Sequence, residues 1–417
     1  MSDDLIRARV WRLHFFTGLF LSPFFIVLAL TGIIYLFKPQ VEPALYQKWL
    51  EVPVGAEKVP YAAQWAQVER EFPGAYLRYM VPPKAEGLAS QFFVRDGQGR
   101  QQTVYVDPYT GRTTGVQRSD LMLMQLAHDF HGELLMGNRG ALLMEVCAGW
   151  GLILIATGLY IWWPFRGLWR KVLQPTLTPR PRWKALHGTL GLCLSAVILL
   201  FLLTGIPWTG VTGGYIDSLS TKLGMGAPPG FGPSPYLSEE VKGRPMVSLD
   251  VLAGIAKDLI PGTEPHISYP YDSRHAAVIL WAAPHPSDSA YIHVDVYSGK
   301  VIHDFRWKDF GIIGKAISYG IALHQGTLFG VWNQALNVLL ALGVLAMSLT
   351  GLRMWWLRRP KNAWLAPPPG SRVPLPLGLK LIILVFCLYV PTTGLSVLAL
   401  LGLDWARGKV ILNRRPL

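Results

Sequence analysis

The chain has 417 residues, is 51% hydrophobic and carries a formal net charge of +13. So large an apolar share, with a positive mean hydropathy of +0.29, exceeds what a single soluble core uses and argues against an ordinary soluble enzyme. The positive charge would suit a nucleic-acid surface, but its distribution along the chain argues against nucleic acid as a partner.

Apolar stretches of about 20 residues, the length that spans a bilayer as a helix, recur along the chain. They predict, in order, a tail (1–12), a first span (13–37), an outer module (38–125), an approach with the second span (126–164), a loop (165–186), a third span (187–208), a second outer module (209–315), an approach with the fourth span (316–357), a loop (358–374), a fifth span (375–403) and a C-terminal tail (404–417). Pro391, before Thr392-Thr393-Gly394, allows a re-entrant pair in place of one fifth crossing.

Basic residues gather at one side of these spans, and nearly all acidic residues fall in the two long outer segments. This pattern predicts a multi-pass membrane protein with a cytoplasmic N-terminus and two large segments on the other side of the membrane. If the fifth stretch crosses once, its basic tail breaks the rule. The basic residues are Arg7, Arg9 and Arg12, then Arg166, Arg170, Lys171, Arg180, Arg182 and Lys184, then Arg358, Arg359, Lys361, Arg372 and Lys380.

The two outer segments share a pattern. A helix-like stretch, 61–72 or 249–260, precedes a strand-like run that enters Asp107-Pro-Tyr-Thr-Gly111 in one segment and Asp295-Val-Tyr-Ser-Gly299 in the other. Glycine after such a strand supplies the positive φ of a tight turn. We therefore expect two small α+β modules and an internally duplicated chain, with span, module and span repeated in parallel.

Four histidines occupy matching positions in the two halves. His14 is followed by Gly18 and Thr31-Gly32, and His187 by Gly191 and Thr204-Gly205; His131 is followed by Gly137, Thr157-Gly158 and Trp162-Trp163, and His324 by Gly330, Thr350-Gly351 and Trp355-Trp356, with equal spacing within each pair. Ionisable side chains at membrane depth are costly and usually functional. Imidazoles on facing helices suit axial ligation of haem iron.

Depth decides the pairing. His14 and His187 open helices that start on the cytoplasmic side, whereas His131 and His324 precede helices that start outside. We predict two b-type haems, one for each pair, and no open axial position. His128 could replace His131. A straight helix from His131 to Trp163 would exceed the bilayer, so either the outer haem lies above it or the chain bends near Gly137 and Gly330.

Other residues carry weaker expectations. Gly18, Gly32, Gly191 and Gly205 lie on the histidine faces and are predicted to leave space for a flat macrocycle, although they could simply allow close helix packing. The second module contains five histidines, most of which are predicted at the surface: His266, His275, His285, His293 and His303. Zinc, a proton relay through Glu145 and ordinary hydrogen-bonded histidines remain alternatives. No Cys-x-x-Cys-His motif exists, which excludes covalent haem.

With these motifs, residues 10–360 resemble the PepSY-associated transmembrane family, and are most similar within it to inner-membrane ferric-siderophore reductases. The resemblance implies PepSY-like periplasmic modules and an oxidoreductase that passes electrons outward to a ferric siderophore, releasing ferrous iron. The sequence has no nucleotide-binding motif. The donor would be a membrane quinol or a cytoplasmic reductase. A haem-free siderophore or metal permease, a conduit to another periplasmic acceptor and a peptidase-binding role are the alternatives.

Overall fold

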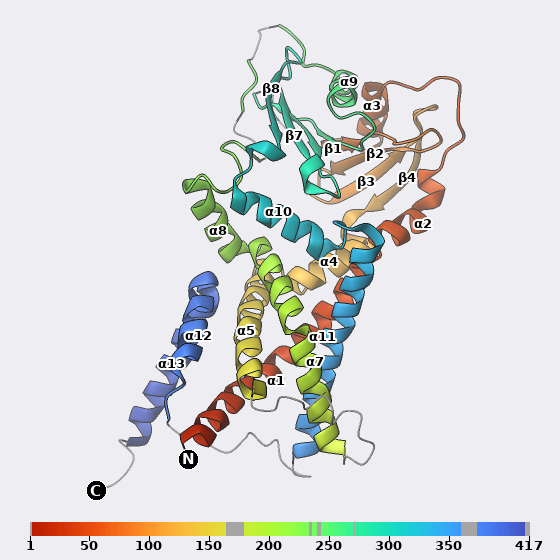
Figure 1. Ribbon diagram of the computed structural model, residues 1–417. Coiled ribbons are helices and arrows are strands. Elements are labelled where there is room, and N and C mark those ends of the chain that lie inside the picture. Colours follow the sequence, from red (N-terminus) through yellow and green to blue (C-terminus); the bar gives the residue numbers. More distant parts are fainter. Residues whose placement is uncertain are drawn as a thin grey trace. The chain divides into compact units, whose positions relative to one another are not determined.

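The computed structural model describes residues 2–163, 179–232, 236–239, 243–270, 272, 274–359 and 373–412. It contains two compact units (Figure 1). The helical unit comprises residues 1–35, 128–217 and 332–417, and the sheet unit comprises residues 36–127 and 218–331. Most residues of the two predicted loops, among them Arg166, Arg170, Lys171, Lys361 and Arg372, lie outside the described residues.

Among the described residues, four helices are long and apolar enough to cross a membrane. They are α1 (Ser2–Leu36), α5 (Asn138–Trp162), α7 (Pro179–Gly205) and α11 (Gly330–Arg358). The helices α1 and α7 begin well before the apolar stretches that predicted them. Their first turns contain arginines, and a helix can continue into the polar interface because its backbone bonds are made internally.

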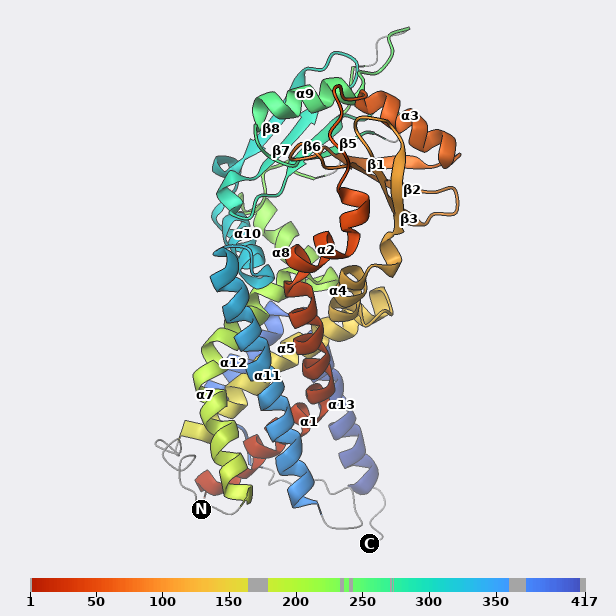
Figure 2. The ribbon, with the colours of Figure 1, turned by 90° about the vertical axis from the view of Figure 1, so that its right-hand side faces the viewer.

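Small residues let α5 pack closely on several neighbours. A Cβ at Gly151 would lie 3.0 Å from Phe25 of α1, and one at Gly149 would overlap the side chain of Thr393. The helix also packs along α7, and Leu152 lies in a fully buried cluster with Val390. Glycines at contact points allow backbones to approach, so α5 is the central helix of this unit (Figure 2).

The fifth apolar stretch is broken. Helix α12 (Leu377–Tyr389) ends at Val390, and α13 (Pro391–Leu412) begins at the proline that follows. A Cβ at Gly394 would lie 2.9 Å from the carbonyl oxygen of Cys387, seven residues earlier, which a continuous helix does not allow. The chain therefore doubles back at this point, as the re-entrant alternative predicts and a single crossing does not.

The chain also bends before two of the long helices. Helix α4 (Leu123–Glu133) is separated from α5 by a turn in which Leu134, Leu135 and Gly137 have positive φ. Helix α10 (Ile312–Gln325) ends at Gly326 and is separated from α11 by a turn that closes at Gly330, again with positive φ at both glycines. Both bends lie where the sequence offered them as one of two alternatives. Positive φ is costly for leucine, so the first bend is strained.

The sheet unit contains one antiparallel sheet of eight strands in the order β4-β3-β2-β1-β5-β6-β7-β8. Helix α3 (Tyr61–Glu71) precedes the first four strands and α9 (Leu249–Leu259) the second four. The two sets join where Met80 of β1 pairs with Ile267 of β5. The strands are β1 (Tyr76–Val81), β2 (Ser90–Arg95), β3 (Gln101–Val106), β4 (Thr113–Arg118), β5 (His266–Ser268), β6 (Ala277–Trp281), β7 (Ala290–Val294) and β8 (Val301–Arg306).

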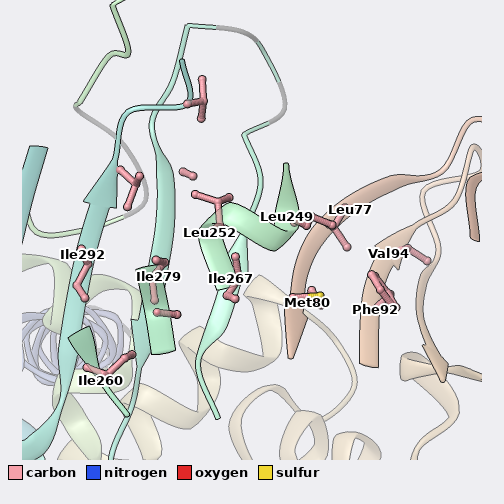
Figure 3. Close-up of a cluster of buried hydrophobic side chains, with 14 of the residues drawn as sticks. Leu77, Met80, Phe92, Val94, Leu249, Leu252, Ile260, Ile267, Ile279 and Ile292 are labelled. Atoms are coloured by element: carbon pink, nitrogen blue, oxygen red, sulfur yellow. The ribbon is translucent and has the colours of Figure 1, made fainter. Parts of the chain in front are cut away.

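One hydrophobic core runs beneath helices α3 and α9 of the sheet unit. Met80, Phe92, Ile267 and Ile292 are fully buried in this core (Figure 3). Leu252 of α9 belongs to the same cluster. The remaining helices of this unit are α2 (Lys38–Leu50) and α8 (Gly210–Lys222), whose first residues belong to the helical unit.

The repeated aspartates explain the repeated turns. Asp107 accepts hydrogen bonds from the backbone of Tyr109 and from the hydroxyl of Thr110, at 2.8 and 2.7 Å. Asp295 accepts equivalent bonds from Tyr297 and Ser298, at 3.0 and 2.8 Å. Each carboxylate replaces the backbone partners that a tight turn leaves unmade. This part of the motif is therefore structural.

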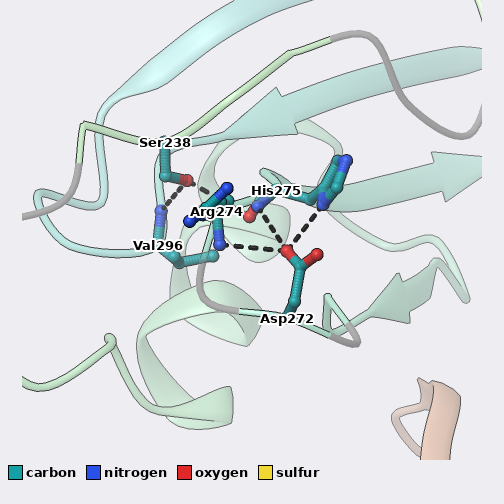
Figure 4. A network of polar contacts seen from close by, with 5 residues as sticks. All are labelled: Ser238, Asp272, Arg274, His275 and Val296. Atoms are coloured by element: carbon teal, nitrogen blue, oxygen red, sulfur yellow. Dashed lines mark hydrogen bonds and ion pairs between the residues drawn. The ribbon is translucent and has the colours of Figure 1, made fainter.

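A polar network holds the loop that precedes β6 (Figure 4). Asp272 accepts bonds from the backbone of Arg274 and from Nδ1 of His275, at 3.0 and 2.6 Å. Ser238 donates to the carbonyl of His275 at 3.3 Å and accepts from the backbone of Val296 at 3.0 Å. The network fixes a surface loop, and it leaves the His275 ring partly exposed.

Candidate functional site

His14 of α1 and His187 of α7 meet inside the helical unit. Their ring centroids are 6.4 Å apart, and their planes cross at 79°. Two imidazoles bound to one metal from opposite sides would have centroids roughly 6–6.5 Å apart, because metal–nitrogen bonds are about 2 Å and each centroid lies about 1.2 Å behind its nitrogen. The separation of these two rings, which we call the inner histidine pair, therefore fits one shared iron.

The surroundings of His14 fix which nitrogen carries its proton. Nδ1 lies 3.1 Å from the carbonyl oxygen of Leu154 and 3.1 Å from the hydroxyl of Thr157, both on α5. A carbonyl oxygen can only accept a hydrogen bond, and the Thr157 hydroxyl donates its own proton to the carbonyl oxygen of Ile153 at 2.8 Å. Nδ1 must therefore be the donor, which leaves the Nε2 lone pair available for a metal.

His187 is held in the same way in the second half of the chain. Its Nδ1 lies 3.0 Å from the hydroxyl of Thr350 on α11, and that hydroxyl donates to the carbonyl of Ala346 at 2.7 Å. The ring passes over Gly351, where a Cβ would lie 3.5 Å from Cε1. Thr350 therefore fixes the tautomer of His187, and the ring lies at an ordinary van der Waals distance from the position of such a Cβ.

His131, the third histidine, is also held by a threonine of another helix. Nδ1 of His131, in the last turn of α4, lies 3.0 Å from the hydroxyl of Thr31 on α1, and a Cβ at Gly32 would approach Cε1 at 3.4 Å. The side chain of His128, the alternative ligand, is 47% exposed, and its Nδ1 lies 3.0 Å from Oδ1 of Asp129. The anchored ring of His131 suits a ligand better than the exposed ring of His128.

His324 belongs to the sheet unit, in the last turn of α10. The internal repeat makes Thr204 the sequence counterpart of Thr31, as His324 is of His131. The pairing of His131 with His324 stays a prediction from sequence depth.

Glycines along the histidine helices do not form the predicted clear strip. A Cβ at Gly18 would meet Leu154 at 3.6 Å, and one at Gly191 would meet Met347 at 3.1 Å. Gly32 faces His131 and not His14. At these three positions, glycine makes room for a side chain of a neighbouring helix, so the close-packing alternative holds. The residue that gives His14 its space is Gly158, whose Cβ would lie 2.9 Å from Cε1.

Glu145, the acidic residue inside α5, is buried, and its carboxylate accepts several hydrogen bonds. Its carboxylate accepts bonds from the backbones of Val211 and Thr212 at 3.1 and 3.2 Å, near the start of α8. The hydroxyls of Thr212 and Thr392 donate to it at 2.5 and 2.8 Å. An ionised carboxylate suits such a set of donors and the positive end of a helix. Glu145 thereby joins α5, α8 and α13, which favours a structural role over proton transfer.

Replacing Glu145 with glutamine should therefore destabilise the helical unit. The amide NH₂ would face donors that need an acceptor, and each buried group left unpaired costs about 1–3 kcal/mol. We expect a lower thermal midpoint in detergent and little change in Asp404→Asn, an exposed acid of α13. An unchanged midpoint in Glu145→Gln, with a slower reaction, would instead support proton transfer.

Two of the five histidines of the second module do not lie at the surface, whereas the other three are at least partly exposed, as predicted for most of them. His293 of β7 is 1% exposed, and its Nε2 lies 3.3 Å from the carbonyl of Gly232. His266 of β5 is half-buried and stacks on Tyr79, with ring centroids 4.4 Å apart. Burial lowers the pKa of both histidines, so the rings are neutral near pH 7. Tyr236 packs against the ring of His293 and Tyr79 against that of His266, and the local sequence reveals neither contact.

The threonines are the functional residues that sequence reasoning missed. Thr31, Thr157 and Thr350 served only as markers of the repeat, although their fixed distance from a histidine was visible. Their role depends on which helices are neighbours. In the structure each threonine contacts a histidine of another helix, and not the histidine that precedes it in its own motif.

The comparison with family models agrees with these motifs. The model that describes the PepSY-associated TM region matches residues 11–358, which include the four histidines with their threonines, most of α1 and the whole of α5, α7 and α11. No curated protein matches the chain. The extent of the family match, together with its long apolar helices, shows that this chain is a membrane protein of the PepSY-associated transmembrane family.

Proposed function

We propose that the protein is a dihaem b-type cytochrome of the bacterial inner membrane that reduces ferric siderophores in the periplasm. The observation that carries the proposal is the inner histidine pair, in which two anchored rings lie 6.4 Å apart with their Nε2 atoms available. His14 and His187 would hold one haem, and His131 and His324 a second. The resemblance to siderophore reductases supplies the acceptor.

The chain's own residues would position the iron and tune its potential. Thr157 and Thr350 accept from Nδ1 of the two ligands, which orients the rings and raises the electron density on each Nε2. Haem, when bound, supplies a one-electron couple. A haem held by both His14 and His187 would have no open position for oxygen, which would favour electron transfer over oxygen binding.

The sheet unit would supply the periplasmic part, as two PepSY-like modules that share one sheet. The siderophore is substrate, and each ferric ion that it carries takes up one electron. Ferrous iron is a softer acid and is bound less tightly by the hard oxygen ligands of a siderophore. Reduction therefore releases it. The repeated helix-and-four-strand order of the two modules supports the proposed duplication.

Spectroscopy of the purified full-length protein tests this proposal. We expect b-type Soret and α bands that sharpen on reduction, and reoxidation in a stopped-flow cell that accelerates with the concentration of a ferric hydroxamate. The gallium complex of the same hydroxamate is the matched control, because it has a similar shape and charge and cannot be reduced. A colourless protein would contradict the cytochrome assignment. Equal rates with iron and gallium would contradict only the acceptor.

A further inference from the structure

Basic and aromatic side chains close the end of the helical unit nearest to the inner histidine pair. The guanidinium of Arg358, the last residue of α11, lies 4.2 Å from the ring centre of Trp11 on α1. Arg9 donates to the backbone carbonyl of Val373, in the segment that leads to α12. These contacts run from helix to helix across the end of the unit, so the protein itself holds the cations in place.

The cluster lies close to the pair along the helix axes. Trp11 precedes His14 by three residues, which is about 4.5 Å of helix rise, and Arg358 follows Thr350 by eight residues, about 12 Å. Thr350 is the residue that anchors His187. The inner pair is therefore within about two turns of this end. An electron that arrives here has a short path to it.

Positive charge at this end has almost no acidic counterpart in the sequence. The described segments 2–12, 179–186, 358–359 and 373–380, which lead into or out of the helices here, contain nine lysines and arginines and two acids, Asp3 and Asp4. Arg182 and Lys184 in the first turns of α7 are exposed, as is Arg353 of α11. Such a field attracts and orients a partner of opposite charge before contact.

We propose that this end, the basic face, docks a small acidic flavoprotein that delivers electrons one at a time to the inner histidine pair. The inference rests on the proposed function. Anionic lipid would be met by cations on the outer perimeter of the helices, whereas Arg9 and Arg358 reach across the end of the unit. In each transfer, the reduced flavin loses one electron, and the iron held by His14 and His187 gains it. No covalent bond of the chain changes.

Binding of oxidised flavodoxin to the full-length protein tests the proposal without any electron transfer. The protein is placed in phosphatidylcholine nanodiscs, and the dissociation constant is measured by interferometry at low and at physiological ionic strength. We expect affinity to fall about tenfold with added salt, because screening shortens the reach of the charges. Arg182→Glu with Lys184→Glu should weaken binding about tenfold at low salt.

Arg139→Glu is the matched control. Arg139 is exposed at the start of α5, 18 residues from Thr157 and therefore about 27 Å of helix from the inner pair. Its replacement should change the affinity less than twofold. Equal losses in both variants would overturn the proposal, as would binding of phosphatidylglycerol vesicles without any binding of flavodoxin. A protein that lacks b-type bands but still binds flavodoxin would contradict the proposed function and would not contradict docking at the basic face.

Discussion

Replacing His14 with alanine should halve the haem content of the purified protein. One axial ligand of the inner site disappears, and His187 alone cannot reproduce a bis-imidazole site. The outer pair contributes the remaining half, so one set of b-type bands should persist. Pyridine haemochrome quantification per mole of protein gives the ratio directly. His187→Ala should have the same effect, and the double variant should lose no more than either single one, because both ligands serve one iron.

His128→Ala is the control for this series. His128 is exposed and lies beside Asp129, whereas His131, one turn later, is anchored by Thr31. The His128 variant should keep its full haem content, and His131→Ala should lose the outer haem. Full content in His14→Ala would refute the proposed pairing. Loss of the haem from His128→Ala, with His131→Ala unaffected, would exchange the roles of these two residues.

Gly158→Ala should remove or distort the inner haem site by adding a single methyl group. That methyl carbon would lie 2.9 Å from Cε1 of His14, closer than real contacts of this kind. The ring would have to leave its hydrogen bonds with Thr157 and Leu154. We expect substantial loss of inner-site haem, or a shift of its α band and midpoint potential in the haem that is retained.

Gly351→Ala gives a matched comparison on the other ligand. The added carbon would lie 3.5 Å from Cε1 of His187, an ordinary van der Waals distance. This variant should keep its spectrum and potential near those of the original protein. Equal damage from the two alanines would mean that the rings are not placed as described. No damage from either would mean that His14 can move without loss of the cofactor.

The sequence predicted those features of the helical unit that depend on the pattern within a single helix. Apolar length predicted the four long helices, and the common depth of His14 and His187 predicted their meeting. The sequence did not predict which helices contact one another. Nothing local shows that Thr157 serves His14 while Thr31 serves His131, or that Glu145 reaches Thr392 almost 250 residues away. Glycine gave an ambiguous signal, because space for a macrocycle and space for a neighbouring helix look alike in a sequence.

The sheet unit shows the same division. The repeated aspartate turns and the two helices were visible as patterns, since turn chemistry is local. The pairing of Met80 with Ile267, which joins two sets of four strands into one sheet, involves residues almost 190 positions apart. Because that seam was unknown, His266 beside it was expected at the surface.

The reversal at Val390 has a consequence for the compartment in which the chain ends. Helix α12, with 13 residues, is too short to cross a bilayer, since crossing takes about 20. If α12 and α13 enter and leave through one leaflet, the four long helices make an even number of traverses, and both termini share a compartment. The trailing cations Arg407 and Lys409 then reinforce the charge asymmetry of the preceding loops and do not oppose it.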